Sequence, residues 1–502
     1  MQVYKVAWLA ALLVGLVELA HGQQGGSKDD SQMFLTDSAN TDYDELYLEP
    51  SAKRSETEAT KRKSEVQLFE TVAKTEAYSG YITVDKAYQS NMFFLFTKAK
   101  FLENAPVGVN ASGHFYAREH NLQAHFDVLY LDQPTGHGYS FTRHTEGYSK
   151  CLEDIVKNIM EFLKKFVKLF VSEEQRDLYV AGEGFGARVA VALSHHLMEQ
   201  QKKPRQRKTC VFKLRGTMCG AGHFGPILPE ADISELYHES GLLDLIGYSQ
   251  AKQNFENVDV LIKAKDSVGA FTLFRQTEQS LKTFTGAQYD GNILQPNVPP
   301  EHKHFYRLCQ TDEDLKRTLH VGPKATFSTM SALVTTLLTE DYARDLSGYL
   351  TALLDSDLKV LVCLGQLDPL RCIPCSEAFF RSLSWECASA FRSALNNFWK
   401  LKGTDDDFVG YIRSVKNFTH LLLKNVGHYP GFDRADVVQE MTKNFVLGEQ
   451  FHQDRDFGPL LKLFQNDPFT SAAEESNQRC YGTTMLQGSG SYMNRYGKSH
   501  LP

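Results

Sequence analysis

The stretch RDLYVAGEGFGARVAV, residues 176–191, decides the fold of this chain. Residues 177–181 are apolar and favour extended backbone, so we predict a short buried strand there. Residues 186–198 carry apolar side chains at helical spacing and are predicted to form a helix. The glycine-rich turn between them has the strand–turn–helix setting of a G-x-S-x-G nucleophile elbow, with Gly184 where the serine should stand. This stretch is therefore a candidate elbow that lacks its nucleophile.

Two other interpretations of the turn compete with the elbow. One is a plain glycine-rich connection between a strand and a helix. The other is a dinucleotide-binding turn, but the third glycine, Gly186, comes one residue earlier than in G-x-G-x-x-G. That motif also requires an acidic residue about 20 positions further on, where residues 202–208 are strongly basic. The elbow interpretation needs catalytic partners elsewhere in the chain.

The N-terminus has the pattern of a secretory signal peptide. Lys5 supplies the positive charge, residues 6–17 are apolar, and Ala20 and Gly22 are the small residues of a cleavage site. The apolar run is too short to span a bilayer, although a buried N-terminal helix is an alternative. We therefore predict a signal peptide at residues 1–22 and a secreted protein without a membrane partner, with a lysosome or secretory vesicle as the alternative location.

Length and composition allow a large globular core. The chain has 502 residues, of which 42% are hydrophobic and 12% aromatic, and its net charge of −7 argues against a nucleic-acid partner. Residues 23–64 are polar, and we predict a disordered stretch or a pro-segment there. The basic pairs at 53–54 and 61–63 are candidate processing sites, but a solvated linker explains them equally well.

Cysteines and glycosylation sequons fit the secretory route. The odd count of nine cysteines leaves at least one thiol free or paired with another chain. Cys372 and Cys375 have the spacing of a redox or zinc half-site, but no second pair stands at zinc spacing, so a structural disulfide or separate pairings is expected. We predict no metal and no cofactor. Asn110 and Asn417 begin sequons that are plausible glycosylation sites.

Short apolar segments alternate with helical ones along the rest of the chain. Residues 155–171 form an amphipathic helix pattern ahead of the elbow strand. Such alternation indicates a largely parallel sheet. The further predicted strands are residues 77–84, 91–96, 127–131, 214–220, 359–364 and 419–424.

Two candidate partners for the elbow follow predicted strands. Asp368 comes after the strand at 359–364, and His428 comes after the strand at 419–424. Functional groups collect at the carboxyl ends of parallel strands. The order Gly184, Asp368, His428 is that of the nucleophile, acid and histidine of a hydrolase triad, in which the histidine takes the proton of the nucleophile and the carboxylate orients the imidazole.

With these residues the chain resembles the serine carboxypeptidase family, most closely its vitellogenic-type members. The resemblance implies an α/β-hydrolase domain over residues 65–447, with a mixed, mostly parallel sheet and a helical cap inserted at about 221–357. Residues 448–502 would be a C-terminal tail. The motifs that carry the resemblance are the strand at 77–84, Asp132-x-Pro-x-Gly-x-Gly-Tyr-Ser140, Gly182-Glu-Gly-Phe-Gly-Ala187, Gly241-Leu-Leu-Asp244, Gly365-Gln-Leu-Asp368, Val409-Gly-Tyr-Ile-Arg413 and Gly427-His428.

The chain departs from the family pattern at the reaction centre. Gly184 replaces the serine, and residues 101–126 lack the family's N-G-G-P-G-type turn, which supplies one oxyanion amide and grips the substrate carboxylate. Only the amide of Phe185 then remains as an oxyanion donor. The resemblance implies a substrate-binding role for Glu183, and Asp368 and His428 become vestigial triad residues.

These departures predict a secreted pseudoenzyme that binds a peptide, a protein or a small ligand. Without its serine, a triad site loses its nucleophile, whereas glycine tolerates the strained elbow backbone. The alternative is a serine-type carboxypeptidase that retains residual removal of C-terminal residues. The sequence does not determine the oligomeric state.

Overall fold

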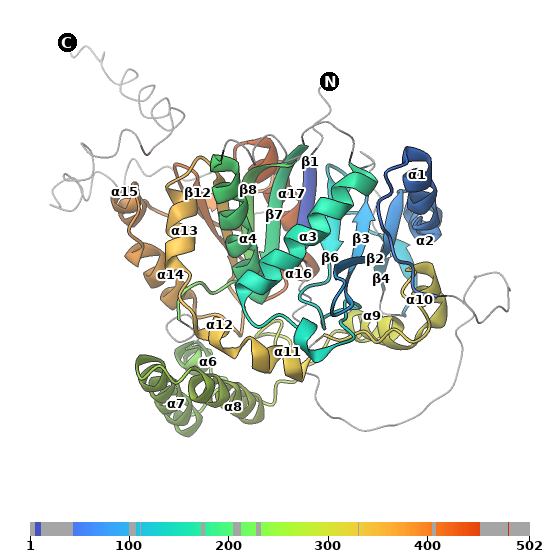
Figure 1. The fold of residues 1–502 in the computed structure, drawn as a ribbon. Coiled ribbons are helices and arrows are strands. Elements are labelled where there is room, and N and C mark those ends of the chain that lie inside the picture. Colours follow the sequence, from blue (N-terminus) through green and yellow to red (C-terminus); the bar gives the residue numbers. More distant parts are fainter. Residues whose placement is uncertain are drawn as a thin grey trace, which may run out of the picture.

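The computed structural model describes residues 6–11, 44–99, 107–110, 112–171, 176–203, 212–226, 232–329, 331–403, 408–451 and 480 (Figure 1). A ten-stranded sheet forms the centre, in the order β10-β11-β12-β9-β8-β7-β1-β6-β3-β2. Its strands are β1 (Val6–Ala11), β2 (Ala77–Asp85), β3 (Ser90–Thr97), β6 (Asp127–Leu131), β7 (Arg176–Glu183), β8 (Phe212–Gly220), β9 (Lys359–Gly365), β10 (Asn397–Trp399), β11 (Gly410–Val415) and β12 (Phe418–Leu423).

The predicted mixed, mostly parallel sheet is confirmed. The strands β6, β1, β7, β8, β9 and β12 run parallel to one another, while β3 and β2 at one edge and β11 and β10 at the other pair antiparallel. All seven strands predicted from sequence are present to within two residues at each end. Local sequence located them because each is a short, nearly continuous apolar run, as expected for strands buried on both faces.

Helices cover both faces of the sheet. On one face, α3 (Leu152–Phe170), α4 (Phe185–Lys202) and α13 (Ser347–Leu354) pack in one large apolar cluster with α14 (Ile373–Ser382) and α15 (Ala388–Ser393). On the other face, α17 (Ala435–Leu447) packs in a second cluster. The side chains of β7 alternate between the two, because Leu178 and Val180 belong to the first and Tyr179 to the second.

The predicted helical cap lies between β8 and β9. Its helices α6 (Ser234–Glu239), α7 (Leu245–Lys263) and α8 (Ser267–Thr285) share a separate apolar core and project beyond the sheet (Figure 1). Asp244 and Asp266 begin α7 and α8 by accepting backbone hydrogen bonds from Gly247 and Gly269. The remaining cap elements are α9 (Pro300–Thr311), α10 (Glu313–Thr318), α11 (Ala332–Leu337) and α12 (Thr339–Ala343).

Part of the stretch predicted to be disordered is ordered. Residues 44–64 include α1 (Arg54–Lys63), and Leu48 is fully buried in the main core. Leu48 N–H donates to Tyr81 O and Tyr81 N–H donates to Leu46 O, so this stretch lies alongside β2. Gly80 permits the approach, since a Cβ there would lie 2.4 Å from Leu48 Cδ1. Few apolar residues are enough to order this stretch because they pack against the edge strand β2. Residues 23–43 lie outside the described part of the chain.

Small elements complete the N-terminal half. They are α2 (Gln67–Ala73), the two-stranded hairpin of β4 (Val107–Val109) and β5 (Phe115–Ala117), and the 3₁₀ helix Thr145–Gly147. One further short helix, α16 (Pro430–Asp433), follows β12 near the C-terminal end of the domain. In the family pattern, the segment after the first hairpin carries the glycine-rich turn. Here the described part of that segment forms the β4–β5 hairpin instead.

Strand β1 comes from the segment predicted to be a signal peptide. Val6–Ala11 lies in the middle of the sheet, between β6 and β7 and parallel to both (Figure 1). Residues 1–5 and 12–22 lie outside the described part of the chain, and their removal as a signal peptide stays a prediction.

Two disulfides join described cysteines. Cys372 and Cys375 are bonded to each other, which is the structural disulfide expected from the sequence rather than separate pairings. Cys387 is bonded to Cys480, which ties the predicted C-terminal tail back to the domain. Cys210 lies outside the described residues, and the free thiols among the described ones are Cys151, Cys219, Cys309 and Cys363.

Candidate active site

The predicted elbow has the backbone geometry of a nucleophile elbow. Gly184 lies between the end of β7 and the start of α4, with φ 59° and ψ −124°. This conformation is costly for a residue that carries a Cβ and accessible to glycine. Gly184 N–H donates to Gly220 O at 2.9 Å, which fixes the turn against β8.

The turn is tight because it has no side chain at position 182. A Cβ on Gly182 would lie 2.0 Å from Gly186 O and 2.8 Å from Ala187 N, inside the first turn of α4. Glycine at position 182 therefore lets the helix start immediately after the strand. This position requires glycine independently of any chemistry.

His428 and Asp368 meet beside Gly184. His428 Nδ1 and Asp368 Oδ2 are 2.9 Å apart, and both side chains are buried. The opposite ring nitrogen, Nε2, faces the elbow: it would lie 3.5 Å from a Cβ built on Gly184, and apart from Gly184 and its two chain neighbours no other described residue would have an atom within 4 Å of that Cβ. The three residues have the arrangement of a Ser-His-Asp triad from which the serine side chain is missing.

The sequence order located these residues because all three elements end at one edge. The strands β7, β9 and β12 belong to a parallel series, so Gly184, Asp368 and His428 follow their carboxyl ends. Asp368 Oδ1 also accepts a hydrogen bond from Leu370 N–H at 2.8 Å, which orients the carboxylate toward the histidine.

Phe185 is positioned as the predicted oxyanion donor. It is the first residue of α4, so its N–H is among the amides that find no carbonyl partner within the helix. Of the glycines in residues 101–126, the segment without the family's turn, Gly108 lies in β4, and a Cβ on Gly113 would contact His304 of α9.

Glu183 is the last residue of β7 and borders the site. Burial raises the pKa of its carboxyl to about 8, and the negative charges of Asp368 and Asp433 contribute. Within the described part of the chain, no hydrogen bond to this carboxyl contributes to its pKa. At neutral and acidic pH it is uncharged and carries a proton that it can donate.

The cap loop at residues 290–293 contacts the backbone of His428, and the sequence alone did not predict this contact. His428 N–H donates to Gly291 O at 2.6 Å, and Ile293 N–H donates to Leu367 O at 3.0 Å. The backbones touch because position 427 has no side chain: a Cβ on Gly427 would lie 2.0 Å from Gly291 O. The loop carries no motif that would have marked it as part of the site.

Asp433 connects this cap loop to the loop after β12 that carries Gly427 and His428, which we call the histidine loop. Its Oδ2 accepts hydrogen bonds from Asn292 Nδ2 at 3.0 Å and from Gly427 N–H at 2.7 Å. Burial raises the pKa of Asp433, and the two donors oppose that shift. Asp433 is thus a structural clasp between the two loops.

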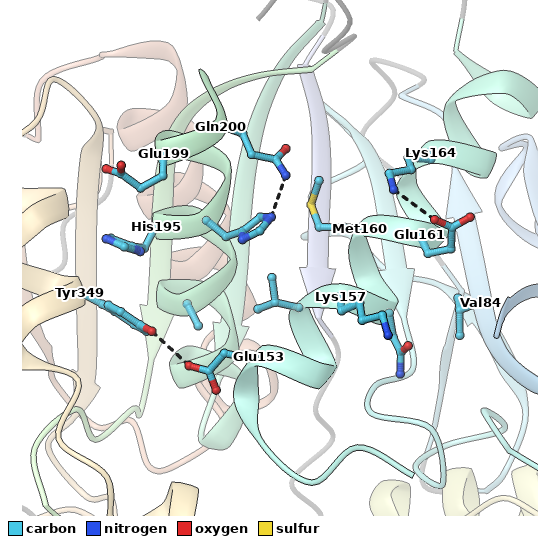
Figure 2. A pocket seen from close by; sticks show the side chains of 14 residues that line it. Val84, Glu153, Lys157, Met160, Glu161, Lys164, His195, Glu199, Gln200 and Tyr349 are labelled. Atoms are coloured by element: carbon cyan, nitrogen blue, oxygen red, sulfur yellow. Dashed lines mark hydrogen bonds and ion pairs between the residues drawn. The ribbon is translucent and has the colours of Figure 1, made fainter. Parts of the chain in front are cut away.

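A cavity of about 660 Å³ lies elsewhere, between α3, α4 and α13 (Figure 2). The α4 residues that line it run from Ala192 to Gln200, roughly 12–24 Å along the helix from Gly184 at 1.5 Å per residue. Several of its polar groups already pair with one another, such as Glu153 with Tyr349 and His196 with Gln200. This cavity is separate from the triad site.

No group of three or more His, Cys, Asp or Glu side chains within the described ranges is placed to hold a metal ion. In the same part of the chain, no helix is both long and apolar enough to cross a membrane.

Comparison with known proteins identifies the family. The family model described as "Serine carboxypeptidase" matches residues 97–448. The chain is 27% identical over 438 residues to the venom serine carboxypeptidase of Apis mellifera, covering 81% of this chain and 91% of that protein. It is 26% identical over 461 residues to the probable serine carboxypeptidase CPVL of Mus musculus, covering 86% and 92%.

A solved structure shows the same fold. The prohormone-processing carboxypeptidase Kex1Δp of Saccharomyces cerevisiae matches with a TM-score of 0.66 and 18% identity, covering 77% of this chain and 96% of that one. Together, the family match and the geometry around Gly184, His428 and Asp368 lead to one conclusion. This chain belongs to the serine carboxypeptidase family and has the α/β-hydrolase fold.

Proposed function

We propose that this protein is a catalytically inactive serine carboxypeptidase homologue that acts by binding a peptide, a protein or a small ligand. The observation that carries the proposal is Gly184 at the nucleophile position, beside a hydrogen-bonded His428–Asp368 pair. In subtilisin, loss of the triad serine lowers kcat by about 2 × 10⁶. The histidine and aspartate have no hydroxyl to activate here.

The groups that border the elbow favour a ligand with a free carboxylate. Glu183 is protonated below a pKa of about 8 and can donate a hydrogen bond. Phe185 N–H lies at the start of α4, where the helix dipole favours an anion. Deprotonation of Glu183 would remove the donor and add a negative charge, so binding of such a ligand weakens as the pH rises through 8.

We further propose that the protein travels the secretory pathway and is secreted, or resides in a lysosome or secretory vesicle. The Cys387–Cys480 and Cys372–Cys375 disulfides support this location, because disulfides persist in oxidising compartments. The signal-peptide pattern at residues 1–22 supports it independently.

Two measurements test the inactive assignment. The purified protein is incubated with N-blocked dipeptides at pH 5 and pH 7.5, and separately with a serine-directed fluorophosphonate; an active family member is the positive control. We expect neither turnover nor labelling. Stoichiometric labelling or carboxypeptidase turnover would instead identify a hydrolase with an unrecognised nucleophile, or with water activated by His428.

Binding is tested by thermal shift with the same dipeptides as free acids and as C-terminal amides. The free acids should raise Tm at pH 5.5 and lose most of that effect at pH 9, while the amides should have little effect at either pH. Equal shifts from acids and amides would contradict a carboxylate-recognising site.

A further inference from the structure

The centre of the sheet contains a strand that the chain supplies from its extreme N-terminus. Strand β1 pairs with β6 at four positions, from Ala7 with Asp127 to Ala10 with Tyr130. It pairs with β7 at six positions, ending with Ala11 opposite Gly182. Without β1, β6 and β7 would face each other across a gap one strand wide, which is about 4.8 Å more than the spacing of paired strands.

The two strands that border this gap are core strands. Val128 and Leu129 of β6 and Leu178 and Val180 of β7 are each at most 3% exposed. Their backbone groups that face β1 would have no partner and little access to water if β1 left, which is strongly unfavourable. The gap therefore requires an occupant or a rearrangement of the sheet.

Several contacts oppose closure of the gap by direct pairing of β6 with β7. On its far side, β6 is paired with β3, and β7 is paired with β8. Helix α3 connects β6 to β7 across the gap, and its apolar face packs in the same cluster as both strands (Figure 1). Moving one half of the sheet toward the other would disrupt these layers together.

An ion pair crosses the same gap at the start of the strands. Asp127 at the beginning of β6 and Arg176 at the beginning of β7 are joined by an Nη1–Oδ2 contact of 2.8 Å, and both side chains are mostly buried. Asp127 also accepts a hydrogen bond from Ala99 N–H at 2.9 Å. The long arginine side chain thus holds the two strands at the separation that an intervening strand needs.

The chemistry of a suitable occupant follows from this environment. It must be extended and parallel to both neighbours, and it cannot carry proline within the paired stretch. Because a central parallel strand is covered by helices on both faces, it should be a continuous apolar run rather than an alternating one. The sequence VAWLAA at Val6–Ala11 has this composition.

We propose that β6 and β7 form an internal strand-acceptor site whose occupant is the chain's own Val6–Ala11 segment. Removal of residues 1–22 as a signal peptide leaves this site open, and the same segment added back as a separate peptide refills it in the same orientation. The added strand ends beside Gly182, so the acceptor site adjoins the elbow. The proposal goes beyond ligand binding at Gly184, and its test does not use that site.

The test starts from the full chain with a site-specific protease sequence inserted after Gly22, cleaved only once the protein has folded. The fragment of residues 1–22 should co-elute with the body in size-exclusion chromatography, as identified by mass spectrometry. Removing the fragment of residues 1–22 at a low denaturant concentration should accelerate amide hydrogen exchange in β6 and β7 by at least tenfold. A synthetic peptide of residues 4–13 should restore the slow exchange.

Proline substitutions supply a matched pair. Leu9 pairs with both Leu129 and Val180, so Leu9→Pro should release the fragment on cleavage, while Val3→Pro, which lies before the strand, should retain it. If the Leu9→Pro chain does not fold, the same comparison is made with synthetic peptides added to the stripped wild-type body. A stripped body that aggregates supports the site if the wild-type peptide, but not the Leu9→Pro peptide, keeps it soluble.

Two outcomes would overturn the proposal. One is a fragment that leaves on cleavage without any change in the exchange of β6 and β7, since the sheet would then be complete without it. The other is equal behaviour of the wild-type and Leu9→Pro peptides, which would show that no strand pairing occurs.

Discussion

Gly184 keeps the backbone geometry of a nucleophile elbow but lacks the side chain that would carry out its chemistry. The residue keeps φ 59° and ψ −124°, and His428 Nε2 still faces it. Apart from the chain neighbours of Gly184, a Cβ at this position would meet only that nitrogen within 4 Å among the described residues. Restoring a serine is therefore a steric possibility, and its cost is confined to backbone strain.

Gly184→Ser tests what the site lacks besides the hydroxyl. We expect slow hydrolysis of p-nitrophenyl esters and peptide turnover near background, because Phe185 N–H is the one predicted oxyanion donor and such donors are usually the largest catalytic contribution. The variant should be less stable by roughly 1–3 kcal/mol, the usual cost of such a backbone conformation, and should therefore unfold at a lower temperature. Gly184→Ala is the control: it carries the same backbone cost without the hydroxyl. Family-like peptidase turnover would show that a second oxyanion donor exists.

Glu183 makes stability depend on pH. Its pKa is raised from 4.5 to about 8 by burial and by Asp368 and Asp433, so the folded state holds a proton that the unfolded state releases. Stability is therefore full below about pH 4.5 and falls as the pH rises through 8. We expect Glu183→Gln to flatten the decline in unfolding free energy between pH 5 and pH 8.5, by on the order of 3 kcal/mol.

The free energy of unfolding is measured by urea unfolding of the parent and of Glu183→Gln across this pH range. Asp132 also has a pKa raised to about 7 by burial, so the difference between the parent and Glu183→Gln curves is the informative quantity. Glu161→Gln removes an exposed carboxylate and is the control. Parallel curves for the parent and Glu183→Gln would show that Glu183 is not protonated in the folded protein.

At the scale of elements, the cap loop and the histidine loop meet backbone to backbone. Gly291 O, Asn292 and Ile293 of the cap contact the stretch that presents His428 and Asp368. The clasp joins the cap to the stretch that presents the triad positions, so changes in the clasp should loosen this contact without altering the triad residues.

Gly427→Ala is predicted to separate the two loops. Its Cβ would lie 2.0 Å from Gly291 O and 3.0 Å from Asn292 Cα, so the cap loop must move and lose its bond to His428 N–H. We expect a loss of roughly 1–3 kcal/mol, as for other overpacked sites, and faster limited proteolysis between residues 286 and 299. Gly431→Ala, where nothing lies within 4 Å, is the control. Unchanged proteolysis and Tm in Gly427→Ala would contradict the clasp.

At the scale of the whole molecule, one disulfide ties the C-terminal region to the domain. Cys387 and Cys480 are 93 residues apart in sequence, and Lys416 N–H donates to Cys480 O at 2.9 Å. The double change to serine should lower stability by about 2–4 kcal/mol, because a long loop is no longer closed in the unfolded chain. The Cys372→Ser/Cys375→Ser protein, which opens a bond of separation 3, should lose less. Equal losses in thermal unfolding would contradict this ranking.

The two glycosylation sequons differ in the folded protein. Asn417 Nδ2, the atom that would carry a glycan, donates to Leu353 O, Ser356 O and Leu358 O, whereas Asn110 is exposed. Expression through the secretory pathway should therefore yield a single glycan, at Asn110. Asn110→Gln should abolish the mass shift on glycosidase treatment, and Asn417→Gln should not change it. A glycan on Asn417 in folded protein would be inconsistent with these three bonds.

Local sequence was enough to predict most strands and the order of the site residues. Short apolar runs indicated β7, β9 and β12, and the residues that follow them could be assigned to one edge because parallel strands end together. Gly184, Asp368 and His428 were found in this way. Their hydrogen bond and the direction of Nε2 then follow from the fold.

Contacts between distant segments decided the rest. The apolar run at Val6–Ala11 fits a signal peptide and also suits a buried parallel strand, and only its pairing with β6 and β7 places it in the sheet. Leu48 lies in a mostly polar stretch of sequence, and only its contact with β2 shows that it is buried. Gly291 has no local sequence pattern that marks it as a hydrogen-bond partner of His428. The physical reason is common to all three: hydrophobicity and turn preferences act over a few residues, whereas a buried backbone group must find its partner wherever the completed fold provides one.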